Sequence, residues 1–184
     1  KLKTLKIMDS AKLERIKAII RNVPDFPKPG ILFRDLTTAF KDPQAMQDLT
    51  AELVEKYRNL GITKVVGIES RGFIMGAVLA NAIGAGFVPI RKPGKLPADT
   101  IKQSYAKEYG TDTIEMHRDA ITPDDVVVIH DDLLATGGTM LAALELVNSC
   151  NPKKVYVDFI VELCALEGRK LFPENVEVNA LIKY

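Results

Sequence analysis

Hydrophobic residues recur at helical spacing in the first third of the chain. Within residues 11–21 the large aliphatic side chains fall three or four positions apart, which predicts an amphipathic helix. A second helix is predicted to begin at Asp42-Pro43, a good N-cap followed by a good first helical residue, and to end at Gly61. Between these helices, residues 24–30 hold three prolines and a glycine, which predicts a stiff, irregular loop.

From residue 64 onward, short apolar runs alternate with helical segments. The predicted strands cover residues 64–68, 87–90, 126–129, 155–163 and 176–182. The predicted helices cover residues 72–83, 139–150 and 165–172. Because strands that alternate with helices form parallel βαβ units, we expect an α/β fold with a central, mainly parallel sheet flanked by helices.

A long polar stretch, residues 93–119, interrupts this alternation. Residues 100–105 and 113–117 are predicted to pair as a hairpin across Gly110. A polar excursion of this length inside a compact domain is often a mobile lid or a binding loop. An ordinary solvated hairpin is the alternative.

Composition narrows the class of protein. A chain of 184 residues with 47% hydrophobic and 27% charged residues suits one globular domain spanning 1–184. The net charge of +1 argues against a nucleic-acid partner, and no apolar run is long enough to predict a membrane span. Cys150 and Cys164 lack metal-ligand spacing and are interpreted as buried thiols, which favours the cytoplasm. Residues 1–7 are interpreted as a tag or a trimmed or disordered segment, and Met8 is a candidate start.

The segment from Val126 to Thr139 is the most informative in the chain. A buried strand is predicted to end at two carboxylates, and ligands of open α/β sheets bind at such strand ends. The small residues that follow have the chemistry of a phosphate-binding loop, with close backbone N–H groups, two hydroxyls and a helix N-terminus: Ala135, Thr136, Gly137, Gly138 and Thr139. The loop matches neither a Walker A motif nor a dinucleotide fingerprint, so ATP and NAD chemistry lose support.

Asp131 and Asp132 are expected to face the same ligand as this loop. Carboxylates accept hydrogen bonds from a ribose diol, and they favour positive charge that develops at the sugar. A solvated turn that happens to carry two acids is the alternative. His130, just before them, is interpreted as a strand side chain that faces away from the ligand.

A hydrophobic strand followed by Asp-Asp and Ala-Thr-Gly-Gly-Thr resembles the motif of type I phosphoribosyltransferases that binds 5-phosphoribosyl diphosphate (PRPP). The resemblance implies a parallel sheet with flanking helices, a small N-terminal hood, here residues 8–35, and a flexible loop, here residues 93–119. The segment Pro24–Asp35 resembles the N-terminal segment of those members that use adenine. It implies that Leu32, Phe33 and Arg34 bind adenine, with Phe33 stacking on the base; a structural role for Phe33 in the core is the alternative.

Two further corners resemble the diphosphate side of the same family. The strand–turn–helix corner at residues 67–73 implies that Ser70 and Arg71 bind the diphosphate, although an Arg at a helix start can also be a plain surface residue. The basic segment at residues 90–97 implies the same role for its cations, with a solvated basic turn as the alternative. Those cations are Arg91, Lys92 and Lys95.

The segment Ser104–Gly110 resembles the mobile catalytic loop of the family. The resemblance implies that Glu108 is the acid–base group near the purine and that Tyr109 closes the site. The catalytic set expected from the sequence is completed by Arg71, Asp131 and Asp132.

The expected reaction is adenine plus PRPP giving AMP and diphosphate, with adenine and PRPP as the small-molecule partners. The resemblance implies Mg²⁺ as cofactor, bound mainly through PRPP with no direct protein ligand, and a homodimer in which a basic residue after the third strand reaches the partner's site. Two alternatives stay open. One is a related enzyme for xanthine, hypoxanthine or guanine, and the other is a regulator that binds PRPP without chemistry.

Overall fold

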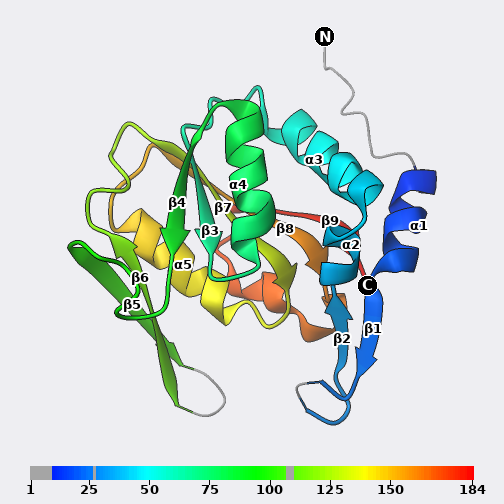
Figure 1. Ribbon diagram of the computed structural model, residues 1–184. Helices are drawn as coiled ribbons and strands as arrows, with labels where there is room; N and C mark the ends of the chain where they lie inside the picture. Colours follow the sequence, from blue (N-terminus) through cyan, green and yellow to red (C-terminus); the bar gives the residue numbers. More distant parts are fainter. Residues whose placement is uncertain (1–9, 27, 107–109) are drawn as a thin grey trace. The chain divides into compact units, whose positions relative to one another are not determined.

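The computed structural model describes residues 10–26, 28–106 and 110–184, and the chain divides into two compact units, residues 1–53 and 54–184. In the first unit α1 (Ser10–Ile19) is followed by β1 (Arg21–Pro24) and β2 (Leu32–Asp35). These two strands pair antiparallel (Figure 1). The predicted loop at residues 24–30 therefore connects a hairpin, and strands of four residues are too short to leave a periodic pattern.

The remaining helices of the first unit are α2 (Thr37–Phe40) and α3 (Pro43–Tyr57), the last of which continues into the second unit. The prediction that α3 begins at Asp42-Pro43 is confirmed. The carboxylate of Asp42 accepts the N–H of Ala45 at 2.7 Å, as an N-cap does. The one-turn helix α2 was not predicted because four residues carry no detectable helical period.

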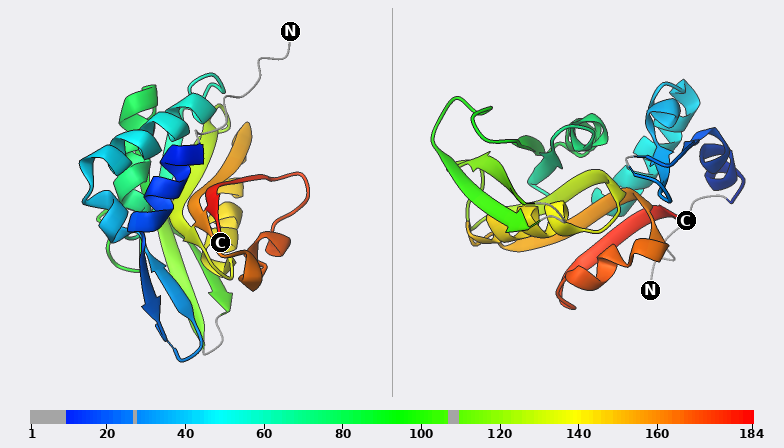
Figure 2. Two further views of the ribbon diagram at one scale, coloured as in Figure 1. Left: turned by 90° about the vertical axis from the view of Figure 1, so that its right-hand side faces the viewer. Right: turned by 90° about the horizontal axis from the view of Figure 1, so that it is seen from below.

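The second unit is built on a five-stranded parallel sheet, and the predicted fold class is confirmed. The strands are ordered β4-β3-β7-β8-β9 across the sheet. Their bounds are β3 (Lys64–Ile68), β4 (Gly86–Ile90), β7 (Val126–Leu134), β8 (Lys154–Glu162) and β9 (Glu177–Lys183). Every adjacent pair is parallel. The crossover helices α4 (Gly72–Ile83) and α5 (Gly138–Asn148) lie on opposite sides of this sheet (Figure 2).

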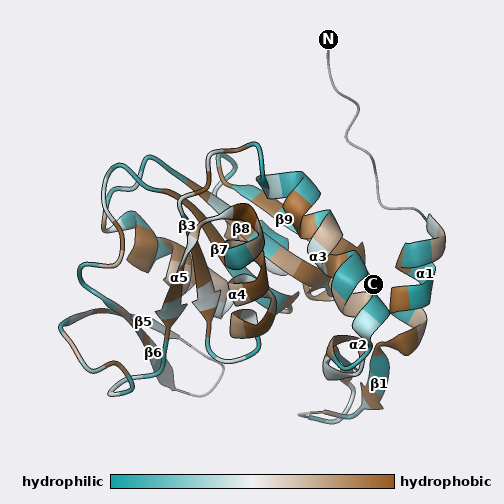
Figure 3. Cartoon of the chain, turned by 45° about the horizontal axis from the view of Figure 1, so that its top comes forward, coloured by the Kyte–Doolittle hydropathy of each residue, from teal (hydrophilic) through white to brown (hydrophobic). Residues whose placement is uncertain are grey.

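The core of the second unit lies around β7, the middle strand. Its side chains alternate between the two faces, and Val127 and Ile129 join Met140 and Leu144 of α5 in one buried cluster. Hydrophobic residues accordingly mark β7, β8 and α4 in Figure 3. In the part of the chain that the structure describes, no helix is long and apolar enough to cross a membrane.

The predicted hairpin in the polar stretch is confirmed as β5 (Thr100–Ala106) and β6 (Thr111–His117), paired antiparallel with Tyr105 opposite Asp112. It is more than a solvated hairpin, because Ile114 and Met116 of β6 are buried in the cluster that α5 joins. Arg91, just after β4, forms an isolated bridge with Glu115 of β6. The hairpin is thus held between α5 and the end of β4.

Three sequence expectations are wrong in detail. Strand β7 runs on to Leu134 instead of ending before the acids, because β8 continues to pair with it as far as Glu162. The predicted helix at residues 165–172 is two 3₁₀ helices, η1 (Cys164–Leu166) and η2 (Gly168–Leu171), which are separated by Glu167 in a left-handed conformation. Cys164 is exposed and Cys150 half-buried, so neither thiol is a core residue.

Candidate active site

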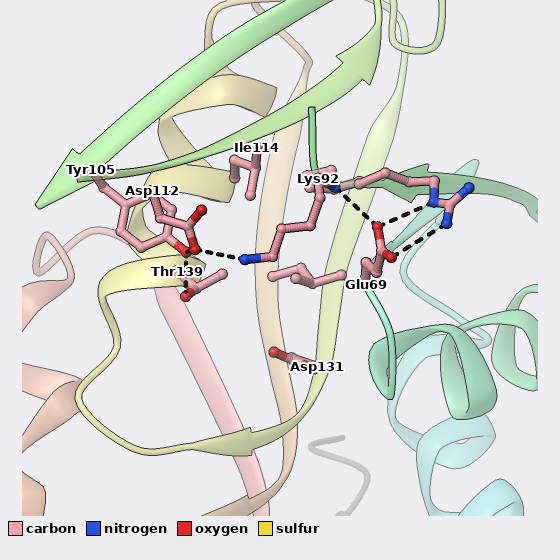
Figure 4. Close-up of a pocket in the computed structure, with 10 residues that line it drawn as sticks. Glu69, Lys92, Tyr105, Asp112, Ile114, Asp131 and Thr139 are labelled. Carbon is pink, nitrogen blue, oxygen red and sulfur yellow. Dashed lines mark hydrogen bonds and ion pairs between the residues drawn. The ribbon is translucent and has the colours of Figure 1, made fainter. Parts of the chain in front are cut away.

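Two neighbouring cavities lie at the carboxyl ends of the parallel strands in the second unit. The larger has a volume of about 160 Å³ and is lined by residues from the ends of β3 and β4, the hairpin, Asp131 and Thr139 (Figure 4). The smaller, of about 110 Å³, is lined by Asp131, the loop after β7 and Phe159 of β8. Because Asp131 and Thr139 line both cavities, the two form one continuous candidate site.

The loop after β7 surrounds the smaller cavity. All five residues of the predicted phosphate-binding loop line it, from Ala135 to Thr139. Gly137 is the N-cap of α5 and has φ of 86°, a left-handed conformation that glycine adopts without steric cost. The turn places the N-terminus of α5, and therefore its unpaired N–H groups, beside the cavity.

Asp131 and Asp132 have different surroundings. Asp132 is 2% exposed, and its carboxylate accepts a hydrogen bond from Nε of Arg71. Asp131 lines both cavities, and its Oδ1 accepts the N–H of Asp132 at 2.9 Å. Burial, together with the neighbouring charge of Asp132, raises the pKa of Asp131 well above its usual value. Asp131 lines the cavities and Asp132 does not, since β7 continues through the pair and adjacent strand residues point apart. That both acids face one ligand stays a prediction.

His130 is fully buried and does not line either cavity. Its Nδ1 lies 2.8 Å from Oδ2 of Asp158 on β8. The other oxygen of Asp158 accepts hydrogen bonds from the Tyr57 hydroxyl and the Asn179 amide, both at 2.7 Å. His130 is thus a buried strand side chain that lies away from both cavities, which agrees with its interpretation as a residue that does not face the ligand.

Arg91 and Lys92, two of the cations predicted for the diphosphate, are held by carboxylates. Nε and Nη2 of Arg91 lie 3.2 and 3.3 Å from the two oxygens of Glu69, and Nζ of Lys92 lies 2.7 Å from Oδ2 of Asp112. The backbone N–H of Lys92 and the Arg91 guanidinium lower the pKa of Glu69. The ion pair with Asp112 raises the pKa of Lys92. The sequence did not assign Glu69 or Asp112, and their partners lie more than 15 positions away in the chain.

The remaining diphosphate candidates lie at the same strand ends. Ser70 is exposed and follows a cis peptide bond after Glu69. The carbonyl oxygen of Lys95 accepts a hydrogen bond from Nη1 of Arg91 at 3.3 Å. Arg71 forms an ion pair with Asp132, as described above.

The hairpin adds Tyr105, Asp112 and Ile114 to the lining of the larger cavity. The Tyr105 hydroxyl lies 2.9 Å from the Thr139 hydroxyl and 3.3 Å from Oδ2 of Asp112. Figure 4 shows the Asp112 carboxylate pointing toward Lys92. This chain of contacts joins the hairpin to the loop after β7. The sequence signal for this contact was the predicted antiparallel pairing of residues 100–105 with 113–117, because residues that face each other across a hairpin have the same neighbours.

The predicted adenine-binding residues lie on β2 in the first unit. The ring of Phe33 is half-buried and contacts the edge of Phe26, with centroids 5.2 Å apart. Leu32 is exposed and Arg34 donates a hydrogen bond to the Asn22 side chain. Glu108 and Tyr109 lie outside the described residues. Within the described ranges, no three His, Cys, Asp or Glu side chains gather as a metal site.

Comparisons with known proteins agree on one family. The model of the phosphoribosyl transferase domain family matches residues 37–170. The chain is 60% identical to adenine phosphoribosyltransferase of Phocaeicola vulgatus over 169 residues, which cover 92% of this chain and 97% of that relative.

Solved structures agree with the sequence relatives. Adenine phosphoribosyltransferase from Rhodothermus marinus is 50% identical, with a TM-score of 0.90 and coverage of 96% of this chain and 100% of that one. The enzyme from Saccharomyces cerevisiae, complexed with D-2,5-dideoxy-2,5-imino-altritol 1,6-bisphosphate and adenine, is 40% identical, with a TM-score of 0.87 and coverage of 94% and 99%.

Proposed function

The chain belongs to the adenine phosphoribosyltransferase family, and we propose that its sugar donor binds in the two adjoining cavities beside β7. The reaction transfers the 5-phosphoribosyl group of PRPP to adenine and gives AMP and diphosphate, a step of purine salvage. The observation that carries the proposed site is the gathering of Asp131 and all five loop residues around one cavity.

The loop Ala135–Thr139 binds the 5′-phosphate in this proposal. Its backbone N–H groups, the hydroxyls of Thr136 and Thr139 and the N-terminus of α5 all suit a phosphate. Asp131 then lies between that phosphate and the larger cavity, where its carboxylate receives the ribose hydroxyls. Asp132 holds Arg71 in place beside the same strand end.

The larger cavity receives the diphosphate. Arg91 and Lys92 line it and now pair with Glu69 and Asp112. Phosphate oxygens accept the same charge-assisted hydrogen bonds as carboxylates, so we expect these cations to exchange one anionic partner for the other when PRPP binds. Ser70, Arg71 and Lys95 supply further donors to the leaving diphosphate.

The base is bound by Leu32, Phe33 and Arg34, with the Phe33 ring as a stacking surface for adenine. The Saccharomyces cerevisiae enzyme was crystallised with adenine and a bisphosphate, which supports separate subsites for base and sugar donor. Glu108 is proposed as the acid–base group near the purine nitrogens, and Tyr109 as the residue that closes the site.

The chemistry develops positive charge at the sugar as the bond to diphosphate lengthens. A carboxylate at Asp131 stabilises that charge, and the cations around Glu69 and Asp112 stabilise the departing diphosphate. Closure of the hairpin over the site excludes water, which would otherwise compete with adenine for the sugar.

Mg²⁺ fits this arrangement when it is held mainly by oxygens of PRPP, because Mg²⁺ sites commonly combine substrate phosphates with at most one or two carboxylates. Asp131 lines both cavities, and its carboxylate oxygens are of the kind that would suit such an ion. When bound, Mg²⁺ neutralises diphosphate charge. We further propose a cytoplasmic enzyme that acts as a homodimer and in which residues 1–184 form one catalytic domain.

The decisive experiment offers the protein PRPP, Mg²⁺ and each purine base in turn. We expect AMP from adenine, at a kcat/KM well above that for guanine, hypoxanthine or xanthine. A preference for any oxopurine would overturn the assignment of the base. Tight PRPP binding with no nucleotide formed from any base would instead identify a regulator.

A further inference from the structure

The backbone of η2 presses directly against the loop Ala135–Thr139. Gly168, the first residue of η2, is buried, and a Cβ atom there would overlap the carbonyl oxygen of Ala135 and lie 3.0 Å from the carbonyl carbon of Thr136. The contact is reciprocal, since a Cβ on Gly137 would lie 2.8 Å from the carbonyl oxygen of Gly168. Separations under about 3 Å are not tolerated by close-packed atoms, so the two backbones meet with no room for a side chain.

The segment that carries Gly168 is itself firmly anchored. The N–H of Leu163 donates to the carbonyl oxygen of Leu134 at 2.9 Å, where the loop begins. Arg169 donates through Nε to Glu162 at 2.9 Å and through Nη1 to the carbonyl oxygen of Val178 at 2.6 Å. The hydrogen bond from Arg169 lowers the pKa of Glu162, which keeps this pair ionised. The segment is therefore fixed to the ends of β7, β8 and β9.

Because the segment that carries Gly168 is anchored and lies against the loop Ala135–Thr139, it determines where the N–H groups of that loop point. The loop itself is made of small residues, and in the described chain its side chains offer little packing of their own. A phosphate cradle works only when its donors are already oriented, because ordering them on binding would cost affinity. Gly168 provides contact with the backbone of Ala135 and Thr136, which is the part of the loop that must not move.

We propose that Gly168 is a positioning residue for the 5′-phosphate of PRPP. Its missing side chain lets η2 support the loop Ala135–Thr139 at backbone distance and so holds the loop in its binding conformation. The inference rests on the proposed function, because it takes that loop as the 5′-phosphate site.

The test is Gly168→Ala. The φ of Gly168 lies outside the left-handed region, so alanine is accepted by the backbone and the substitution acts only through its methyl group. We expect the loop to shift by a fraction of an ångström and the KM for PRPP to rise about 10-fold to 100-fold. Dissociation constants of AMP and ribose 5-phosphate, which carry the same phosphate, should rise by a similar factor.

A merely structural role would not give this selectivity. The inhibition constant of inorganic pyrophosphate and the KM for adenine should stay within about twofold of the wild-type values, because neither ligand needs the loop. The matched control is Gly86→Ala, a glycine of ordinary φ whose nearest neighbour is the flexible end of the Lys64 side chain at 3.2 Å. That variant should leave every constant unchanged.

Arg169→Lys keeps the proposal testable if Gly168→Ala does not fold. Lysine retains the charge but cannot make the hydrogen bonds of the planar guanidinium to both Glu162 and Val178. The segment that carries Gly168 is then held less firmly, and ribose 5-phosphate binding should weaken about threefold. The inference is overturned if either folded variant binds ribose 5-phosphate as wild type does, or if pyrophosphate and adenine binding weaken equally. If the wild type binds ribose 5-phosphate yet forms no AMP, the proposed function fails while this binding comparison still decides the role of Gly168.

Discussion

At the scale of single residues, adjacent acids divide the work at the end of β7. Asp132 is buried in an ion pair with Arg71, whereas Asp131 lines the cavities with a raised pKa. A carboxyl whose folded pKa is raised favours the fold below its unfolded pKa, and this contribution is lost as the pH rises through the folded pKa. At any pH above its folded pKa, the ionised Asp131 is therefore a cost to stability.

We accordingly expect Asp131→Asn to lower kcat about 100-fold without lowering stability at neutral pH. Urea unfolding across a pH series should find the variant at least as stable as wild type near pH 8, and relatively less stable as the pH falls toward the ordinary range of a carboxyl. A loss of stability at neutral pH with full activity per folded molecule would contradict the role of Asp131.

Asp132→Asn is the companion change with the opposite expectation for stability. It removes the charge that accepts the hydrogen bond from Arg71 at a site where Asp132 is 2% exposed. We expect a loss of about 1–3 kcal/mol in the free energy of unfolding, measured by the same urea titration. Equal stabilities for the two variants would show that Arg71 does not hold Asp132 as the structure describes.

A third residue-scale prediction concerns Asp35 at the end of β2. Burial acts to raise its pKa, but hydrogen bonds from Thr37 and Arg21 outweigh burial and lower the pKa to about 2. A depressed carboxyl stabilises the fold above its unfolded pKa, and that stability is lost as the pH falls through about 2. Thr37→Val should raise the pKa of Asp35 in an NMR titration and reduce stability near neutral pH. Thr50→Val, whose hydroxyl donates to the carbonyl oxygen of Met46, should leave that pKa unchanged.

At the scale of elements, the hairpin β5–β6 is tied to the segment after β4 by the ion pair between Lys92 and Asp112, which PRPP would have to replace. Lys92 is 51% exposed, so its pair with Asp112 is worth about 0–1 kcal/mol. If Asp112 competes with the diphosphate for Lys92, Asp112→Asn should lower the KM for PRPP by up to about fivefold. Ser104→Ala, which removes a contact with Thr113 elsewhere on the hairpin, is the control. A raised KM in Asp112→Asn would mean that Asp112 positions Lys92 instead.

Elements were predictable from the sequence where burial imposes a period. The strands of the parallel sheet and helices α3 to α5 each leave a hydrophobic run or stripe long enough to read. The hairpin β1–β2, helix α2 and the 3₁₀ turns around Glu167 do not, because they are four residues long or less. Glu69, Asp112 and Gly168 were not predicted from the sequence for a different reason. The residues that each of them contacts are distant in the chain and are brought near only by the fold.

At the scale of the whole molecule, the family was predictable because its motif occupies one continuous stretch of the sequence. Asp131 to Thr139 is a continuous stretch, and the family comparisons bear out the reading drawn from it. The adenine assignment depended on a second local segment, Pro24–Asp35, and the relatives support it as well. Assembly has no such local signal, so the homodimer stays a prediction.

The homodimer can be tested together with the assignment of Arg91. Sedimentation equilibrium should give twice the monomer mass. Arg91 lines the larger cavity of its own chain together with Asp131, so each site needs both residues from one chain. Asp131→Asn and Arg91→Ala should therefore each be nearly inactive, and mixed dimers of the two should stay inactive because neither site then has both native residues. Monomer mass would overturn the dimer, and activity regained in the mixed dimers would mean that Arg91 serves the site of the partner copy.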